Sequence, residues 1–150
     1  MDDPSKILLV DDNPNDVELI LAALSEYQLV DEVFVAHDGE EALDYLHRQG
    51  AHELRSVENP KAVLLDLKLP KVDGLEVLER IKTDPDLKTT PVVMLISWRE
   101  ERDLIKSYDL TTNAYVVKPM SFKDFIEAVK EVRLFWAVIN QPPSITERRR

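Results

Sequence analysis

The sequence predicts an α/β fold with a doubly wound parallel sheet, built from five strand–helix units, (βα)₅. Short apolar runs recur along the chain, and longer stretches with helical spacing of apolar residues separate them. Apolar runs without polar alternation are typical of strands buried on both faces, as in parallel sheets. Right-handed crossovers then place helices on both faces of the sheet. The runs are residues 7–10, 33–36, 62–65, 92–96 and 114–117.

Helix start and stop signals lie between these runs. Asn13 precedes Pro14, which puts a capping residue before a proline at the first helical position. Ser97 and Ser121 each stand three residues before an acidic residue, the spacing of a capping box. Pro85 disfavours helix at the residue before it, so the third predicted helix ends there.

Composition and charge limit the function. The chain has 150 residues, 44% hydrophobic and 32% charged, which suits one soluble domain. It has no cysteine, which excludes disulfides and thiolate metal sites. A formal net charge of −10 argues against direct binding to nucleic acid. No apolar run approaches the ~18 residues of a membrane span. We therefore expect a cytoplasmic protein, with a domain over residues 1–140 and a poorly ordered tail over 141–150.

Charged side chains follow three of the predicted strands. Asp11 and Asp12 come directly after the first strand. Asp66 follows the third apolar run and Lys118 follows the fifth. In doubly wound sheets, ligands bind beyond the carboxyl ends of the strands, so these four side chains would share one crevice. Each carboxylate taken singly is explained equally well as a helix cap or loop residue, but their combination with the lysine favours a site.

The chemistry of this group points to phosphoryl transfer. Carboxylates so close together repel one another, and a bound cation relieves that repulsion. Oxygen ligands without cysteine or histidine favour Mg²⁺. A carboxylate held against Mg²⁺, beside a lysine that neutralises phosphoryl oxygens, is a competent nucleophile for forming an aspartyl phosphate.

Over about residues 5–140 the chain resembles the receiver domain of bacterial two-component response regulators. The segments that carry the resemblance are ILLVDDNPNDVELI, AVLLDLKLPKVDGLEVLERIK, PVVML and AYVVKPMSF. The residues that follow the first strand, the linker around Pro85 and the ending at 140–143 resemble stand-alone regulators that partner phytochrome-type histidine kinases. The resemblance implies the CheY-like, flavodoxin-like strand order 2-1-3-4-5.

The resemblance also implies a role for each site residue. Asp66 would be the phosphoacceptor. Asp11 and Asp12 would hold Mg²⁺ together with Asp66 and the backbone carbonyl of Lys68. Lys118 would pair with the phosphoryl oxygens.

The sequence departs from the family at the position of the switch hydroxyl. The family has Thr or Ser thirty residues after the acceptor, where this chain has Ile96. The missing hydrogen bond to a charged acceptor is worth roughly 1.5–3 kcal/mol. Tyr115 occupies the position of the family's aromatic switch, and we expect Ile96 to weaken its coupling to phosphorylation. Lys68 and Trp98 flank the path of the hydrolytic water in the family, so we expect slow dephosphorylation.

The last predicted helix carries more apolar residues than its core stripe needs. Leu134, Phe135 and Val138 fall off that stripe, toward a face that would otherwise meet water. An extra apolar face of this kind marks an interaction site. By resemblance to many receivers, we predict a homodimer formed through the fourth and fifth helices and the fifth strand. In the alternative, the tail folds back and covers this face.

The sequence suits three functional classes to different degrees. The favoured one is a response regulator that accepts a phosphoryl group from a sensor histidine kinase, with a bacteriophytochrome as a candidate kinase. It would catalyse its own phosphorylation and dephosphorylation but act on no diffusible substrate. The alternative is a phosphate-independent pseudo-receiver, fixed in one conformation by Ile96. A phosphatase with an aspartate nucleophile is disfavoured, because Lys68 stands where the acid/base carboxylate would be.

Overall fold

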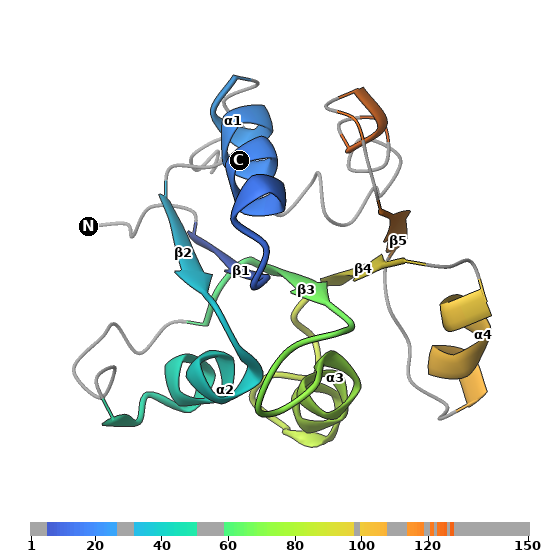
Figure 1. The fold of residues 1–150 in the computed structure, drawn as a ribbon. Coiled ribbons are helices and arrows are strands. Elements are labelled where there is room, and N and C mark those ends of the chain that lie inside the picture. The colour runs from blue at the N-terminus through green and yellow to red at the C-terminus, as the bar shows by residue number, and fades with distance from the viewer. Residues whose placement is uncertain are drawn as a thin grey trace, which may run out of the picture.

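The computed structural model describes residues 6–26, 32–50, 59–97, 100–107, 114–118, 121, 123–125 and 127. Strands and helices alternate throughout these ranges (Figure 1). The five predicted strands are confirmed, with ends that differ from the prediction by at most one residue. The elements are β1 (Lys6–Val10), α1 (Pro14–Glu26), β2 (Glu32–Ala36), α2 (Gly39–His47), β3 (Ala62–Asp66), α3 (Gly74–Thr83), β4 (Val92–Ile96), α4 (Glu100–Ser107) and β5 (Ala114–Val117).

The strands form one parallel sheet in the order β2-β1-β3-β4-β5, as predicted. This order makes β1 and β3 neighbours within the sheet. The segments that follow them therefore lie side by side at the carboxyl ends of the strands. Figure 1 shows α1 and the helical residues 123–125 on one face of the sheet, with α2, α3 and α4 on the other. The sheet is therefore covered on both faces, which explains why its strands lack polar alternation.

Two hydrophobic clusters pack on the two faces of the sheet. Successive residues of a strand point to opposite faces, so Leu8 joins one cluster and Leu9 the other. The cluster under α1 includes Ile20 and Phe125. The cluster on the opposite face includes Ile105 of α4 together with residues of α2 and α3. Every residue of β3 and β4 is buried, which makes these two strands the centre of the core.

The helix boundaries follow the predicted capping signals. The Asn13 side chain accepts hydrogen bonds from the backbone N–H groups of Asn15 and Asp16, at 2.9 and 3.3 Å. The helix α3 ends at Thr83, and Asp84 before Pro85 has an extended backbone with φ −92° and ψ 120°. Both observations confirm the prediction, since a capping side chain supplies a first-turn acceptor and proline excludes helix at the preceding residue.

The two predicted capping boxes have different outcomes. The Ser121 hydroxyl accepts a hydrogen bond from the Asp124 N–H at 3.0 Å, as the spacing predicts. The Ser97 N–H donates to the Glu101 carboxylate at 2.7 Å, so the bond is made by the residue after the predicted partner. The difference matters for the site, because Glu101 is buried beside the loop that follows β3.

Close backbone approach fixes the loop between β3 and α3. A Cβ atom added to Gly74 would overlap the carbonyl oxygen of Asp66, and one added to Gly39 would overlap that of Val72. The Gly74 N–H donates to the Leu67 carbonyl at 2.8 Å. The two glycines therefore allow the loop that follows Asp66 to pack tightly against α2 and α3.

Several predictions fall on residues that the structure does not describe. These are the tail over 141–150, Trp98, and the proposed dimer residues Leu134, Phe135 and Val138. Among the described helices, none is both long enough and apolar enough to cross a membrane.

Candidate functional site

The structure brings the predicted acidic residues together at the carboxyl end of the sheet. Asp11 directly follows β1, and Asp66 is the last residue of β3. One carboxylate oxygen from each of Asp11, Asp12 and Asp66 lies within 4.8 Å of the other two. Asp11 and Asp66 are buried, whereas Asp12 is exposed. The cluster thus has a buried interior and one side that is open to solvent.

The predicted lysine reaches this cluster from two strands away. The Lys118 Nζ lies 3.1 Å from Asp11 Oδ2 and 3.1 Å from Asp66 Oδ2. The backbone N–H of Lys118 donates to the Ile96 carbonyl at 2.6 Å, which extends the pairing of β5 with β4 by one residue. The sheet therefore fixes the backbone position of Lys118, and the long lysine side chain brings the ammonium to the acidic residues.

A third carboxylate, which the sequence reasoning missed, also binds this lysine. Asp16 Oδ2 lies 2.7 Å from Lys118 Nζ, the shortest of the three contacts. Asp16 belongs to the first turn of α1, whereas Asp12 lies in the loop before that helix. Its acidic character was visible in the sequence, but first-turn acidic residues are common helix-dipole partners. Only the tertiary structure, in which the Lys118 ammonium reaches the first turn of α1, shows that Asp16 faces the lysine.

Backbone amides orient the carboxylates that Lys118 contacts. The Asn13 N–H donates to Asp11 Oδ1 at 3.0 Å, and the Lys68 N–H donates to Asp66 Oδ1 at 3.3 Å. Each buried carboxylate thus has one oxygen held by the loop that follows its strand and the other held by Lys118. Such hydrogen bonds satisfy charged groups that burial would otherwise penalise.

Electrostatic repulsion within the cluster is only partly relieved. The pKa of Asp66 is raised to about 6, first because the carboxyl is buried and second because of the charge of Asp11, while Lys118 and the Lys68 N–H oppose the rise. Burial by itself would lower the pKa of Lys118. The hydrogen bond from Asp16 and the charges of Asp66 and Asp11 outweigh that effect, so the pKa of Lys118 lies above its ordinary value. Lys118 therefore stays charged, whereas burial and the charge of Asp11 disfavour the ionised form of Asp66.

The donor set fits a hard divalent cation. Asp11, Asp12 and Asp66 offer carboxylate oxygens in one small volume, and exposed Asp12 leaves room for water ligands. Oxygen-only ligands with retained waters are what Mg²⁺ prefers. The raised pKa of Asp66 supports the same conclusion, because a cation would remove the repulsion that raises it. The Lys68 carbonyl, the fourth ligand implied by the resemblance, stays a prediction.

The two predicted switch positions lie on the face of the sheet that α4 covers. Ile96 is 1% exposed and belongs to the same hydrophobic cluster as Ile105 of α4. Tyr115 is half-buried and packs against that cluster. Its ring centroid lies 5.9 Å from the guanidinium carbon of Arg102, which also belongs to α4. An apolar side chain therefore fills the position where the family has a hydroxyl, and Tyr115 contacts α4 directly.

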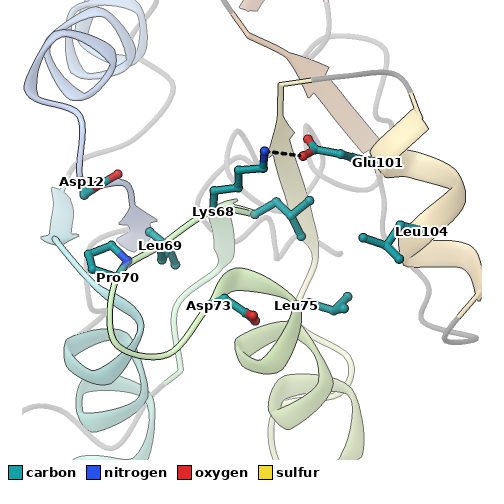
Figure 2. Close-up of a pocket in the computed structure, with 9 residues that line it drawn as sticks. Asp12, Lys68, Leu69, Pro70, Asp73, Leu75, Glu101 and Leu104 are labelled. Carbon is teal, nitrogen blue, oxygen red and sulfur yellow. Dashed lines mark ion pairs between the residues drawn. The ribbon is translucent and has the colours of Figure 1, made fainter.

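A pocket of about 500 Å³ opens beside the acidic cluster, between the β3–α3 loop and α4 (Figure 2). An ion pair spans it, with Lys68 Nζ 3.4 Å from Glu101 Oε2. The remaining lining is mostly apolar and includes Leu104, which is 45% exposed. Sequence reasoning identified Lys68 but not its partner, because Glu101 is one of several acidic residues at the start of α4.

Comparison with known proteins places these features in context. The sequence model of the response regulator receiver domain matches residues 7–130. Response regulator Rcp1 from Synechocystis sp. is 41% identical over 133 residues, which cover 89% of each chain. A solved structure of the Mn²⁺-bound form of Rcp1 aligns with a TM-score of 0.75 at 38% identity, covering 93% of this chain and 97% of that one.

Two further solved structures are similar over almost the whole chain. The bacteriophytochrome response regulator RtBRR aligns with a TM-score of 0.82 at 51% identity, covering 96% of this chain and 87% of that one. The phosphorylated cyanobacterial phytochrome response regulator RcpA aligns with a TM-score of 0.76 at 42% identity, covering 93% of this chain and 99% of that one.

Because the ionised form of Asp66 is disfavoured in the folded protein, replacing it with a neutral residue should increase stability in a pH-dependent way. The folded-state pKa of Asp66, about 6, lies above the ordinary value of 3.8, so the folded protein binds the proton more tightly than the unfolded chain does. Stability from this group is present below about pH 4 and is lost as pH rises through about 6. Asp66→Asn should therefore raise the free energy of unfolding at pH 7 by about 1–3 kcal/mol in a chelating buffer.

Urea denaturation at pH 7 and at pH 4 measures this effect. Most of the gain should vanish at the lower pH, where the folded wild-type carboxyl is protonated and the unfolded one is partly protonated. Asp103→Asn, at an exposed position of α4, serves as the control and should change little at either pH. An Asp66→Asn variant no more stable than wild type at pH 7 would contradict the electrostatic account.

Proposed function

Because the chain belongs to the response regulator receiver family, we propose that it is a phosphorylation switch in which Asp66 accepts a phosphoryl group from a sensor histidine kinase. One observation carries the proposal. The buried Asp66 carboxylate lies 3.1 Å from the Lys118 ammonium and within 4.8 Å of two further carboxylates. This is the arrangement that an oxygen nucleophile, a cation site and a phosphoryl-binding lysine require.

The proposed reaction is an in-line transfer. An oxygen of Asp66 bonds to the phosphorus of the kinase phosphohistidine as the phosphorus–nitrogen bond breaks, and the nitrogen leaves with the electron pair. Lys118 stabilises the charge that spreads over the phosphoryl oxygens. Mg²⁺, held by Asp11, Asp12 and Asp66, would neutralise phosphoryl oxygens when bound. Hydrolysis of the aspartyl phosphate by water resets the switch, so the domain promotes both reactions on itself.

The identity of the kinase is the finer part of the proposal. RtBRR and RcpA are named as phytochrome response regulators, and both align with more than nine-tenths of this chain. We assign a phytochrome-type histidine kinase as the partner on that similarity. Signal output would come from altered protein–protein contact, because the net charge of −10 disfavours direct DNA binding.

One observation favours a second candidate function. Ile96 is fully buried in an apolar cluster and offers no hydrogen-bond donor toward a phosphoryl group. A receiver whose α4 face does not respond to Asp66 would act as a phosphate-independent interaction module. The retained carboxylates and Lys118 weigh against this candidate, because the module would have no use for their unrelieved repulsion.

We also propose a homodimer through the fifth helix, on the strength of its additional apolar face. Leu134, Phe135 and Val138 would contribute that face, together with α4 and the edge of β5. In the described part of the sheet, β5 pairs with β4 on one side and stands last in the strand order. Contact with a second copy would cover the outer edge of this terminal strand.

Phosphorylation is tested by intact mass after incubation with acetyl phosphate. Wild-type protein should gain one phosphoryl group in the presence of Mg²⁺ and none in a chelator. Asp66→Asn should gain none, and Asp103→Asn should behave as wild type. Wild-type protein that gains no phosphoryl group with Mg²⁺ present would favour the phosphate-independent module.

Restoring the switch hydroxyl should strengthen the response to phosphorylation. The added hydrogen bond of Ile96→Thr is worth roughly 1.5–3 kcal/mol, so the population of the switched state should rise about tenfold or more. The NMR signals of the Tyr115 ring measure that population. Ile96→Val removes a methylene without adding a hydroxyl and should give no such rise. An equal response in the two variants would show that the hydroxyl is not the limiting element.

The dimer is tested by sedimentation at several protein concentrations. Phe135→Asp places a charge in the proposed interface and should weaken the dimer by at least about tenfold. Glu127→Gln, at an exposed position of the predicted last helix, is the control and should leave assembly unchanged. Self-association of Phe135→Asp at wild-type strength would exclude this face.

A further inference from the structure

One carboxylate joins the loop after Asp66 to the end of β4. Glu101 Oε2 lies 3.4 Å from Lys68 Nζ, and Glu101 Oε1 accepts a hydrogen bond from the Ser97 N–H at 2.7 Å. The Glu101 side chain is 11% exposed, whereas that of Lys68 is 65% exposed. The buried acid thus forms the fixed end of the pair, and the lysine is the end that is able to move.

The movable lysine lies beside the phosphoacceptor. Lys68 is two residues after Asp66, and its backbone N–H donates to Asp66 Oδ1 at 3.3 Å. Asp12 of the acidic cluster lines the same pocket as Lys68 and Glu101 (Figure 2). The Lys68 ammonium stands on a flexible four-carbon stem, which allows it to move from the Glu101 carboxylate toward a group attached to Asp66.

Lys118, which already contacts Asp66, has few hydrogen-bond donors left for a further acceptor. A lysine ammonium has three N–H donors, and Lys118 contacts three carboxylates, those of Asp11, Asp16 and Asp66. A phosphoryl group adds three strong acceptor oxygens to the site. These oxygens would therefore attract a further ammonium, and Lys68 follows Asp66 by two residues in the same loop.

We propose that Glu101 is a positioning residue, which holds the Lys68 ammonium beside the site, and that phosphorylation draws Lys68 away from Glu101. This inference rests on the proposed function of Asp66. It supplies a route from the phosphoryl group to α4 that does not use the hydroxyl absent at position 96.

The consequence for α4 follows from its first turn. Glu101 and Arg102 are adjacent in that turn, and the Arg102 guanidinium lies 5.9 Å from the Tyr115 ring centroid. When the contact to Lys68 is lost, the constraint between the β3–α3 loop and α4 disappears, while the Ser97 hydrogen bond still holds the start of the helix. The change at Asp66 thereby reaches Arg102 and Tyr115, the same face that the family's hydroxyl switch addresses.

The experiment compares four variants by NMR, with Mg²⁺ and beryllofluoride as the phosphoryl mimic. Lys68→Met keeps the apolar stem and removes the ammonium. Glu101→Gln removes the charge and keeps an acceptor for the Ser97 N–H. The double variant combines them. Lys71→Met is the matched control, because Lys71 lies in the same loop, is 62% exposed and pairs with surface carboxylates. The readouts are the amide shifts of Ser97 and Arg102 on adding the mimic.

Lys68→Met and Glu101→Gln should each shift the α4 equilibrium by about two- to fivefold, the worth of a partly exposed ion pair. Their responses to the mimic should shrink by similar amounts, and the double variant should lose no more than either single variant. The Lys71→Met response should match wild type. A Ser97 response that is unchanged in Lys68→Met, or losses that add in the double variant, would overturn the inference.

Intact mass after acetyl phosphate treatment separates this inference from the proposed function. If wild type and all four variants gain one phosphoryl group while their amide shifts stay alike, the Glu101 inference fails and the function of Asp66 stands. If wild-type protein gains no phosphoryl group and shows no response to the mimic, both fail together.

Discussion

The Lys118 ammonium, placed among three carboxylates, is the interaction on which the arrangement of the site depends. Asp11 follows β1, Asp66 ends β3, Asp16 belongs to α1, and the lysine follows β5. One charge thus ties together the two central strands, the edge strand and a covering helix. The contact is buried, so its loss would leave uncompensated anions in the interior, which is far more costly than losing a surface ion pair.

The fold keeps this cluster negative in spite of the lysine. Burial and the charge of Asp11 hold the pKa of Asp66 near 6 even with Lys118 at 3.1 Å. A site optimised for stability alone would have fewer carboxylates. The excess negative charge would attract a divalent cation and, through that cation, a phosphoryl group. The ionised Asp66 carboxylate thus lowers the stability of the fold at the site where phosphoryl transfer would need it, a common compromise at functional sites.

The side of the site that faces α4 differs from the family pattern in its residues and in its hydrogen bonds and ion pairs. Ile96 fills the hydroxyl position with an apolar side chain that packs in the core. Beside it, Glu101 binds both the Ser97 N–H and the Lys68 ammonium. An electrostatic contact of this kind acts over a longer distance than a hydroxyl hydrogen bond, and it depends more on salt. The proposed route through Lys68 and Glu101 would link Asp66 to α4 without a hydroxyl at position 96.

The sequence by itself determined the strands, the caps and the identity of the central acidic residues. These are local patterns: apolar runs, a capping side chain before Pro14, and charged residues directly after strands. Only the tertiary structure revealed Asp16 and Glu101 as partners of the two lysines. Both are ordinary first-turn acids in the sequence, since a helix dipole explains them equally well. Which face of α1 or α4 meets a lysine depends on how each helix packs on the sheet, and that packing is settled by contacts far apart in the chain.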